Sequence, residues 1–139
     1  MFRRILVPVD FTPKNERALR AAREMAEILE GEITLVHVVE SLEDELDTDL
    51  EKFYERLSVR AEERMAAALA SLGDGQFARR STIIVGHRAK AIVEYAEREK
   101  FDVILLSSHR VDPDRPGADW MTISYKVAIL ARCPVLLVK

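Results

Sequence analysis

The sequence has almost no cysteine and no apolar run long enough to cross a membrane. Cys133 is the only cysteine among 139 residues, so no disulfide can form within the chain. That usage is typical of a reducing compartment, and we expect a cytoplasmic protein. A membrane helix needs about 20 consecutive apolar residues, and no run approaches that length. Residues 1–4 lead into a short apolar segment without the cleavage pattern of a secretory signal.

The chain also has little net charge and few aromatic side chains. Its net charge of -3 gives no general attraction to nucleic acid or to an anionic membrane. Hydrophobic residues make up 48% and charged residues 32%, which is the composition of a globular protein. There is no linker, internal repeat or low-complexity tract. The length suits a single domain covering residues 1–139.

Short β-rich apolar runs alternate with stretches in which apolar residues recur at helical spacing. Nearly continuous apolar strands indicate that both faces of the sheet are covered, and right-handed crossovers leave few topologies. We therefore predict a three-layer α/β fold with a five-stranded parallel sheet. The expected strands are 5–9, 33–39, 81–85, 103–106 and 134–138, and the expected helices are about 13–30, 53–73, 88–100 and 121–131.

Three local signals mark the ends of the early elements. Pro8 lies within the first apolar run, and because a proline is rare inside a central strand we expect it near the strand end or at a bulge. Thr12 followed by Pro13 predicts an N-cap and a first helical residue. Gly31 predicts the stop of that helix.

Acidic residues are dense between the second strand and the second helix. We interpret this acidic segment as a solvated loop that runs into a helix. A divalent metal site is the alternative, but the spacing of a calcium loop with its central glycine is missing. The acids stand at positions 40, 43, 44, 45, 47, 49 and 51.

Five motifs, in order, resemble those of the universal stress protein family, and together they cover essentially the whole chain. They are ILVPVD at 5–10, LVHVV at 35–39, GHRAKAI at 86–92, FDVILLSSH at 101–109, and the segment 124–138, which contains CPVLLV. The resemblance implies the strand order 3-2-1-4-5. It also implies a ligand crevice at the carboxyl ends of strands 1 and 4, where the strand order reverses, as is general for open α/β sheets.

The resemblance further implies a homodimer that pairs through the last strand, because family members commonly dimerise there. An exposed apolar edge strand is also an aggregation hazard if it is left unpaired. The residues of the expected dimer strand are Pro134, Val135, Leu136, Leu137 and Val138.

Many family members bind ATP through glycines that follow strand 4. Two glycines stand three positions apart, and a third follows after nine intervening residues and precedes a small hydroxyl residue. Amides without a nearby Cβ can wrap a phosphate closely. Here Ser107 and Arg110 replace the first two glycines, and Met121 replaces the third. The spacing from Arg110 to Met121 is one residue too long. Phe11 replaces the glycine that usually follows the aspartate of strand 1.

Other features of the family's nucleotide site remain. Asp10 lies beside the nucleoside in the family, the backbone of Val38 faces adenine, and Thr122 and Ser124 supply hydroxyl groups. Arg110 could contact phosphate through its side chain. We expect no cofactor, with ATP as the alternative. The crevice candidates are Asp10, Val38, Ser107, His109, Arg110, Thr122 and Ser124.

The last helix carries a further hypothesis about the phosphate site. Asp119 precedes Thr122 by three residues and is a plausible N-cap. Its carboxylate would then accept from the amides that would otherwise hold phosphate. On this hypothesis Asp119→Gly raises nucleotide affinity. Trp120, in the same loop, is expected to pack the loop over the crevice, with a partner anchor as the alternative.

Metal and catalytic motifs are weak. We interpret His37 as a strand residue rather than a ligand, whereas His87 and His109 follow strands and could line the crevice. With Cys133 they form no three-ligand zinc spacing, so we expect no metal. Ser108 precedes His109, but neighbours at a strand end point to opposite faces, so we expect the two side chains to diverge.

The sequence thus predicts a non-enzymatic, dimeric stress-response protein that acts through unidentified partner proteins, with a degenerate nucleotide crevice. There is no GxSxG elbow or P-loop, and we expect no catalytic residues. The alternatives are an ATP- or AMP-binding regulatory module with slow ATP hydrolysis, and an enzyme of unknown substrate.

Overall fold

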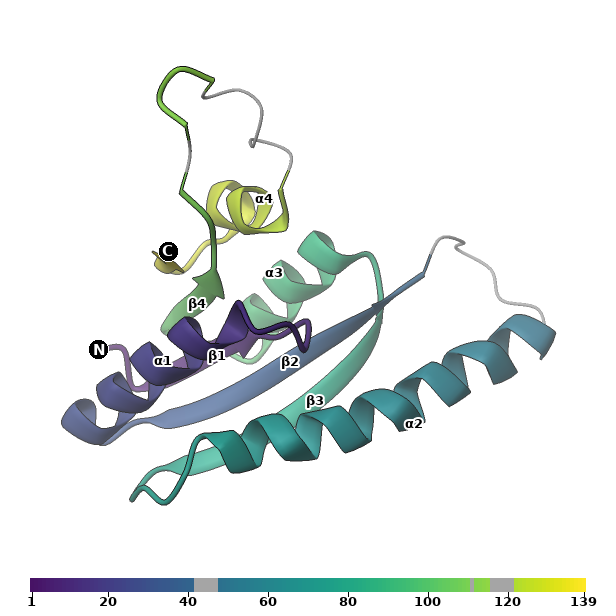
Figure 1. Cartoon of the computed structure of the whole chain (residues 1–139), viewed down its shortest axis with the longest axis horizontal. Helices are drawn as coiled ribbons and strands as arrows, with labels where there is room; N and C mark the ends of the chain where they lie inside the picture. Colours follow the sequence, from purple (N-terminus) through teal and green to yellow (C-terminus); the bar gives the residue numbers. More distant parts are fainter. Residues whose placement is uncertain (42–47, 111, 116–121) are drawn as a thin grey trace.

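Strands and helices alternate along the whole chain in the computed structural model, which describes residues 1–41, 48–110, 112–115 and 122–139 (Figure 1). The elements are β1 (Arg4–Pro8), α1 (Asn15–Leu29), β2 (Glu32–Glu40), α2 (Thr48–Ser71), β3 (Ala78–Gly86), α3 (Arg88–Arg98), β4 (Val103–Ser107), α4 (Ile123–Leu130) and β5 (Val135–Val138). In the described residues no helix is both long enough and apolar enough to cross a membrane.

The five strands form one parallel sheet, as the sequence pattern predicts, in the order β3-β2-β1-β4-β5 that the family resemblance implies. The central strands are buried on both faces, and successive residues point to opposite sides. Ile5, Val7 and Ile33 belong to the core under α1 and α2. Leu6 and Val36 belong to the core under α3 and α4. The apolar strands of the sequence therefore serve two cores, one in each interlayer space.

The observed strand ends lie within three residues of the predicted ones. Pro8 is the last residue of β1, which confirms the prediction that it lies near a strand end. β3 begins earlier than expected because it pairs with β2 over its full length, from Ala78 opposite Glu32 to Gly86 opposite Glu40.

The start of the first helix differs from the prediction. The helix begins at Asn15 rather than Pro13, and no side chain caps it. The hydroxyl of Thr12 instead donates to Oδ1 of Asp10 at 2.6 Å. The Thr12 side chain is thus turned to the carboxylate two residues earlier and caps no helix amide, so the predicted N-cap is wrong.

The end of that helix is placed correctly, but for a different reason. The left-handed residue that stops the helix is Glu30, with φ of 53°, and its amide donates to the carbonyl of Ala26. Gly31 is needed because Arg3, the residue just before β1, passes very close to it. A Cβ on Gly31 would lie 2.6 Å from the carbonyl oxygen of Arg3.

Candidate functional site

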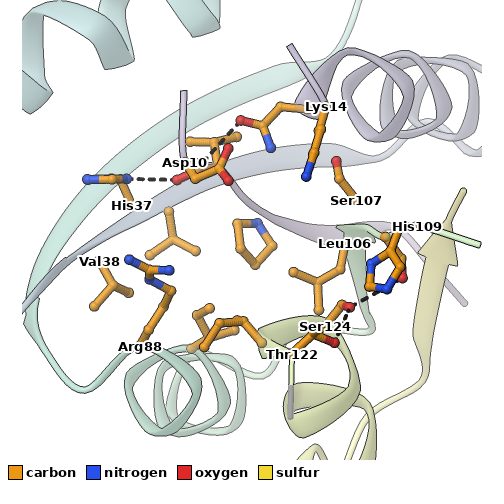
Figure 2. A pocket seen from close by; sticks show the side chains of 17 residues that line it. Asp10, Lys14, His37, Val38, Arg88, Leu106, Ser107, His109, Thr122 and Ser124 are labelled. Atoms are coloured by element: carbon orange, nitrogen blue, oxygen red, sulfur yellow. Dashed lines mark hydrogen bonds between the residues drawn. The ribbon is translucent and has the colours of Figure 1, made fainter. Parts of the chain in front are cut away.

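A crevice opens at the carboxyl ends of β1 and β4, where the strand order reverses. Its volume is about 240 Å³, close to the lower end of the usual range for small-molecule sites. The ends of β1, β2 and β4 form its floor, and the beginnings of α1, α3 and α4 form its walls (Figure 2). Open α/β sheets bind ligands at this position.

The structure brings six of the seven predicted crevice residues together and leaves one out. Arg110 is exposed and does not line the crevice. The six that do line it are Asp10, Val38, Ser107, His109, Thr122 and Ser124.

The loop after β1 is held by Asp10. Its Oδ1 accepts from the amide of Thr12 at 3.0 Å and from the Thr12 hydroxyl, while the Asp10 amide donates to Oδ1 of Asn15 at 3.1 Å. Partial burial raises the pKa of Asp10, but the hydrogen bonds from Thr12 and Asn15 outweigh it and leave the pKa below its usual 3.8. The crevice therefore keeps a negative charge beside β1.

Phe11 adopts the left-handed backbone that its position needs, with φ of 64°. Its ring lies against His37, with the ring centroids 4.3 Å apart. Nδ1 of His37 is 2.7 Å from the carbonyl oxygen of Val9. Because a carbonyl only accepts, Nδ1 carries a proton. His37 is a strand residue, as interpreted from the sequence, yet it also lines the crevice.

Three hydroxyl groups meet where α4 begins. Oγ of Ser124 lies 3.2 Å from Oγ of Ser108 and 3.3 Å from Oγ1 of Thr122. These hydroxyl groups therefore satisfy one another. The hydroxyl of Ser107 is different, because it is buried and has no hydrogen-bond partner among the described residues.

Ser108 and His109 both line the crevice, although the sequence predicts that they diverge. The strand pleat ends at Ser107, so strict alternation of faces no longer applies to the next two residues. Their side chains still contact different partners. Ser108 contacts Ser124, whereas the ring of His109 meets the ring of Tyr125 edge-on at 6.2 Å.

Two cationic residues at the crevice were missed from the sequence. In Figure 2 the side chain of Lys14 points into the crevice from the start of α1. Arg88 lines the opposite wall at the start of α3 and is 3.3 Å from a carboxylate oxygen of Glu40. Helices that follow parallel strands begin at the carboxyl edge of the sheet, so their first residues were the available signal.

Several sequence predictions fall outside the described residues. These are Asp119 as the N-cap, Trp120 as loop packing, Met121 at the position of the third glycine, and the central part of the acidic segment. Among the residues that the structure does describe, no three histidine, cysteine, aspartate or glutamate side chains are grouped to hold a metal ion.

Comparison with known proteins gives a consistent result. The sequence pattern of the Universal stress protein family matches residues 1–139. A universal stress protein of Methanocaldococcus jannaschii is 28% identical, with 78% of each chain covered. The structure of the universal stress protein UspA from Lactobacillus plantarum superimposes with a TM-score of 0.81 at 21% identity, covering 99% of this chain and 98% of that one. A universal stress protein from Archaeoglobus fulgidus, solved in complex with dAMP, gives a TM-score of 0.72 at 21% identity with both chains fully covered.

Proposed function

Because this chain belongs to the universal stress protein family, we propose that it is a non-enzymatic stress-response regulator that acts as a homodimer. Its crevice is degenerate as a phosphate site. The observation that carries this proposal is the position of Ser107. Its side chain lines the crevice and its hydroxyl is buried, at the place where the ATP-binding pattern has a glycine.

The hydroxyl groups around α4 support a non-enzymatic function. A serine nucleophile needs a base within hydrogen-bond reach and a third group that orients the base. The Ser108 and Thr122 hydroxyls are instead directed at Ser124. The cytoplasmic location that the sequence suggests is kept as part of the proposal, as is the action through partner proteins.

Nucleotide binding is the second candidate, and the contents of the crevice favour it over other ligands. Asp10 and Val38 lie in the crevice, and Lys14 adds a positive charge that suits an anion. One solved relative is a complex with dAMP and another is a complex with cAMP. A nucleoside monophosphate has one phosphate instead of three, so its binding depends less on the missing glycines than the binding of ATP does.

A thermal-shift titration separates the two candidates. The purified protein is first extracted and analysed for bound nucleotide, and its melting temperature is then measured with ATP and magnesium, with AMP and with dAMP. A bound ligand at a hundred times its dissociation constant stabilises the fold by about 2.7 kcal/mol. We expect no shift for ATP. A clear shift for ATP, or co-purified ATP, would overturn the degenerate crevice.

A variant tests the role of the side chain at position 107. If the Ser107 side chain occupies phosphate space, Ser107→Gly combined with Arg110→Gly should raise the affinity for ATP. Arg110→Gly alone is the matched control, because Arg110 lies outside the crevice. Equal ATP binding by the wild type, the control and the double variant would remove the argument from Ser107.

The proposed dimer rests on the open edge of β5. The carbonyl groups of Pro134 and Val138 accept from the amides of Ile104 and Ser108 in and after β4, at 3.0 and 2.8 Å. Because successive backbone groups point to opposite sides of a strand, the amide of Leu137 points to the open edge. Among the described strands none pairs there.

Exposed apolar side chains flank that edge and support its burial in a dimer. Leu136 on β5 is 45% exposed, and Ile129 and Leu130 on α4 are exposed as well. We expect sedimentation analysis at about 100 μM to show a dimer, since self-association follows mass action. Leu136→Glu should shift it to the monomer, whereas Ile28→Glu, on the exposed surface of α1, should leave it a dimer. If the wild type is a monomer, or if Leu136→Glu and Ile28→Glu dissociate equally, β5 is not the dimer interface.

A further inference from the structure

A second hollow lies on α2 and the end of β3, away from the crevice at β1 and β4. It is open to solvent and has a volume of about 530 Å³. Tyr54, Val59 and Val85 contribute its apolar surface, and Glu51, Glu55 and Glu62 line it from α2. We call these six residues the α2 groove. In Figure 1 the first turns of α2 extend past the end of β3, so this part of the helix is not covered by the sheet.

The apolar surface of the α2 groove is unusually exposed for a helix that packs on a sheet. Val59 is 56% exposed and Val85 is 41% exposed, although they lie on different elements. Phe53 is also exposed, and its ring meets the ring of Tyr54 edge-on at 5.7 Å. Single exposed apolar residues are ordinary, but a group of them that lines one hollow beside charged side chains favours an interaction site.

The rim of the α2 groove is acidic, and its charges are not neutralised. Glu51, Glu55 and Glu62 are exposed, and none forms an ion pair with another described residue. Glu51 and Glu55 are four residues apart on one helix face, where like charges repel each other. Elsewhere on the surface, pairs of opposite charge at this spacing are formed, as between Arg23 and Glu27. The rim thus offers three carboxylates to an incoming cation.

The spacing of the rim defines the shape of a complementary partner. The three glutamates and Ser58, which also lines the hollow, recur every three or four residues and so form one stripe along α2. The stripe is about 16 Å long at 1.5 Å per residue. A helix laid along it would bring its own side chains at the same spacing opposite the carboxylates, with an apolar seam against Val59 and Val85.

We propose that the α2 groove docks a basic amphipathic helix of a partner protein. Such a helix supplies lysine or arginine side chains at the spacing of the three glutamates and a narrow apolar face for the groove. The chain's own segment 42–47 does not fit this role, because its sequence contains four acidic residues, at 43, 44, 45 and 47, and would add like charge.

The probe is a synthetic helical peptide of about 16 residues with lysines at i, i+4, i+7 and i+11 beside a leucine seam. A control peptide has the same composition in an order that breaks the stripe. Binding of the fluorescently labelled peptides to the intact protein is measured by anisotropy. We expect the striped peptide to bind, with an affinity that falls as salt is raised, and the scrambled peptide to bind at least about tenfold more weakly.

Matched variants locate the binding. Glu51→Gln, Glu55→Gln and Glu62→Gln together should weaken binding by about tenfold, since exposed ion pairs contribute modestly and three are lost. The control changes net charge equally at exposed glutamates outside the groove, with Glu16→Gln, Glu24→Gln and Glu63→Gln, and should keep the wild-type affinity. Val59→Ser should weaken binding without changing charge.

Four results would overturn the proposal. These are no binding of the striped peptide at millimolar concentration, equal binding of both peptides, equal weakening by the two triple variants, and burial of Val59 in a self-associated form of the chain. The last result would identify the groove as an interface between copies. None of these results depends on the crevice or on the β5 edge.

Discussion

Replacing Gly31 with alanine should destabilise the protein more than a single methyl group usually does. A Cβ at this position would lie 2.6 Å from the Arg3 carbonyl oxygen, and 3.2 and 3.3 Å from the Arg3 Cα and carbonyl carbon. All three are backbone atoms, so no side-chain rotation can relieve the contact. The start of β1 has to move away from the start of β2.

The expected cost follows from the local contacts. Overpacking of this kind costs about 1–3 kcal/mol. The displaced Arg3 carbonyl also accepts from the Glu32 amide at 2.7 Å, and losing that bond costs about 1 kcal/mol. Alanine offsets about 0.4–1 kcal/mol by restricting the unfolded chain. The free energy of unfolding should therefore fall by about 1–3.5 kcal/mol, which is a drop in melting temperature of about 3–12 °C.

Gly86 provides a matched control on the same sheet. A Cβ there would meet the Cβ of Ala91 at 3.8 Å, which is ordinary van der Waals contact. Gly86→Ala should therefore be neutral or slightly stabilising. Urea unfolding of both variants at one protein concentration, followed by circular dichroism, measures the difference. A Gly31→Ala variant as stable as Gly86→Ala would refute the close approach of β1 to Gly31.

Two further predictions concern the crevice and its neighbourhood. Because hydrogen bonds hold the folded pKa of Asp10 below its usual 3.8, its charge stabilises the fold above about pH 5, and this contribution is lost as the pH falls through the folded pKa. The difference in unfolding free energy between wild type and Asp10→Asn should therefore shrink with acidification, and a difference independent of pH would contradict the assignment. The hydroxyl of Tyr125 is buried without a hydrogen-bond partner in the described part of the chain, so Tyr125→Phe should change the unfolding free energy by less than about 1 kcal/mol or stabilise the fold. A larger loss of unfolding free energy, measured by thermal unfolding, would mean that the Tyr125 hydroxyl has a hydrogen-bond partner.

The turn after β1 shows how local signals can mislead in detail. Thr12 followed by Pro13 is a sound helix-start pattern, and a helix does begin nearby. The hydroxyl of Thr12 nevertheless donates to the carboxylate of Asp10, two residues away, and accepts from no helix amide. The pattern predicted the element correctly and assigned the wrong role to the residue.

The two cationic residues of the crevice, Lys14 and Arg88, show the limit of reasoning from local sequence patterns. Lys14 and Arg88 are 74 positions apart in the sequence (88 − 14) and belong to no shared motif. Their approach depends on two helices that begin at the same sheet edge on opposite faces. The exposed groove on α2 was missed for a related reason, since Val59 and Val85 become neighbours only when α2 packs along β3.

The sequence alone determined the order of elements, the parallel sheet and the edge at which a crevice forms. Hydrophobic periodicity and short connections are local, and right-handed crossovers leave little freedom in how such elements assemble. The tertiary structure decided which side chains share a space. It directed the Ser108 and Thr122 hydroxyls to Ser124, left the Ser107 hydroxyl buried in the crevice, and made Gly31 necessary through a strand distant in sequence. Most of these outcomes depend on contacts between segments that are distant in the sequence, which no local pattern encodes.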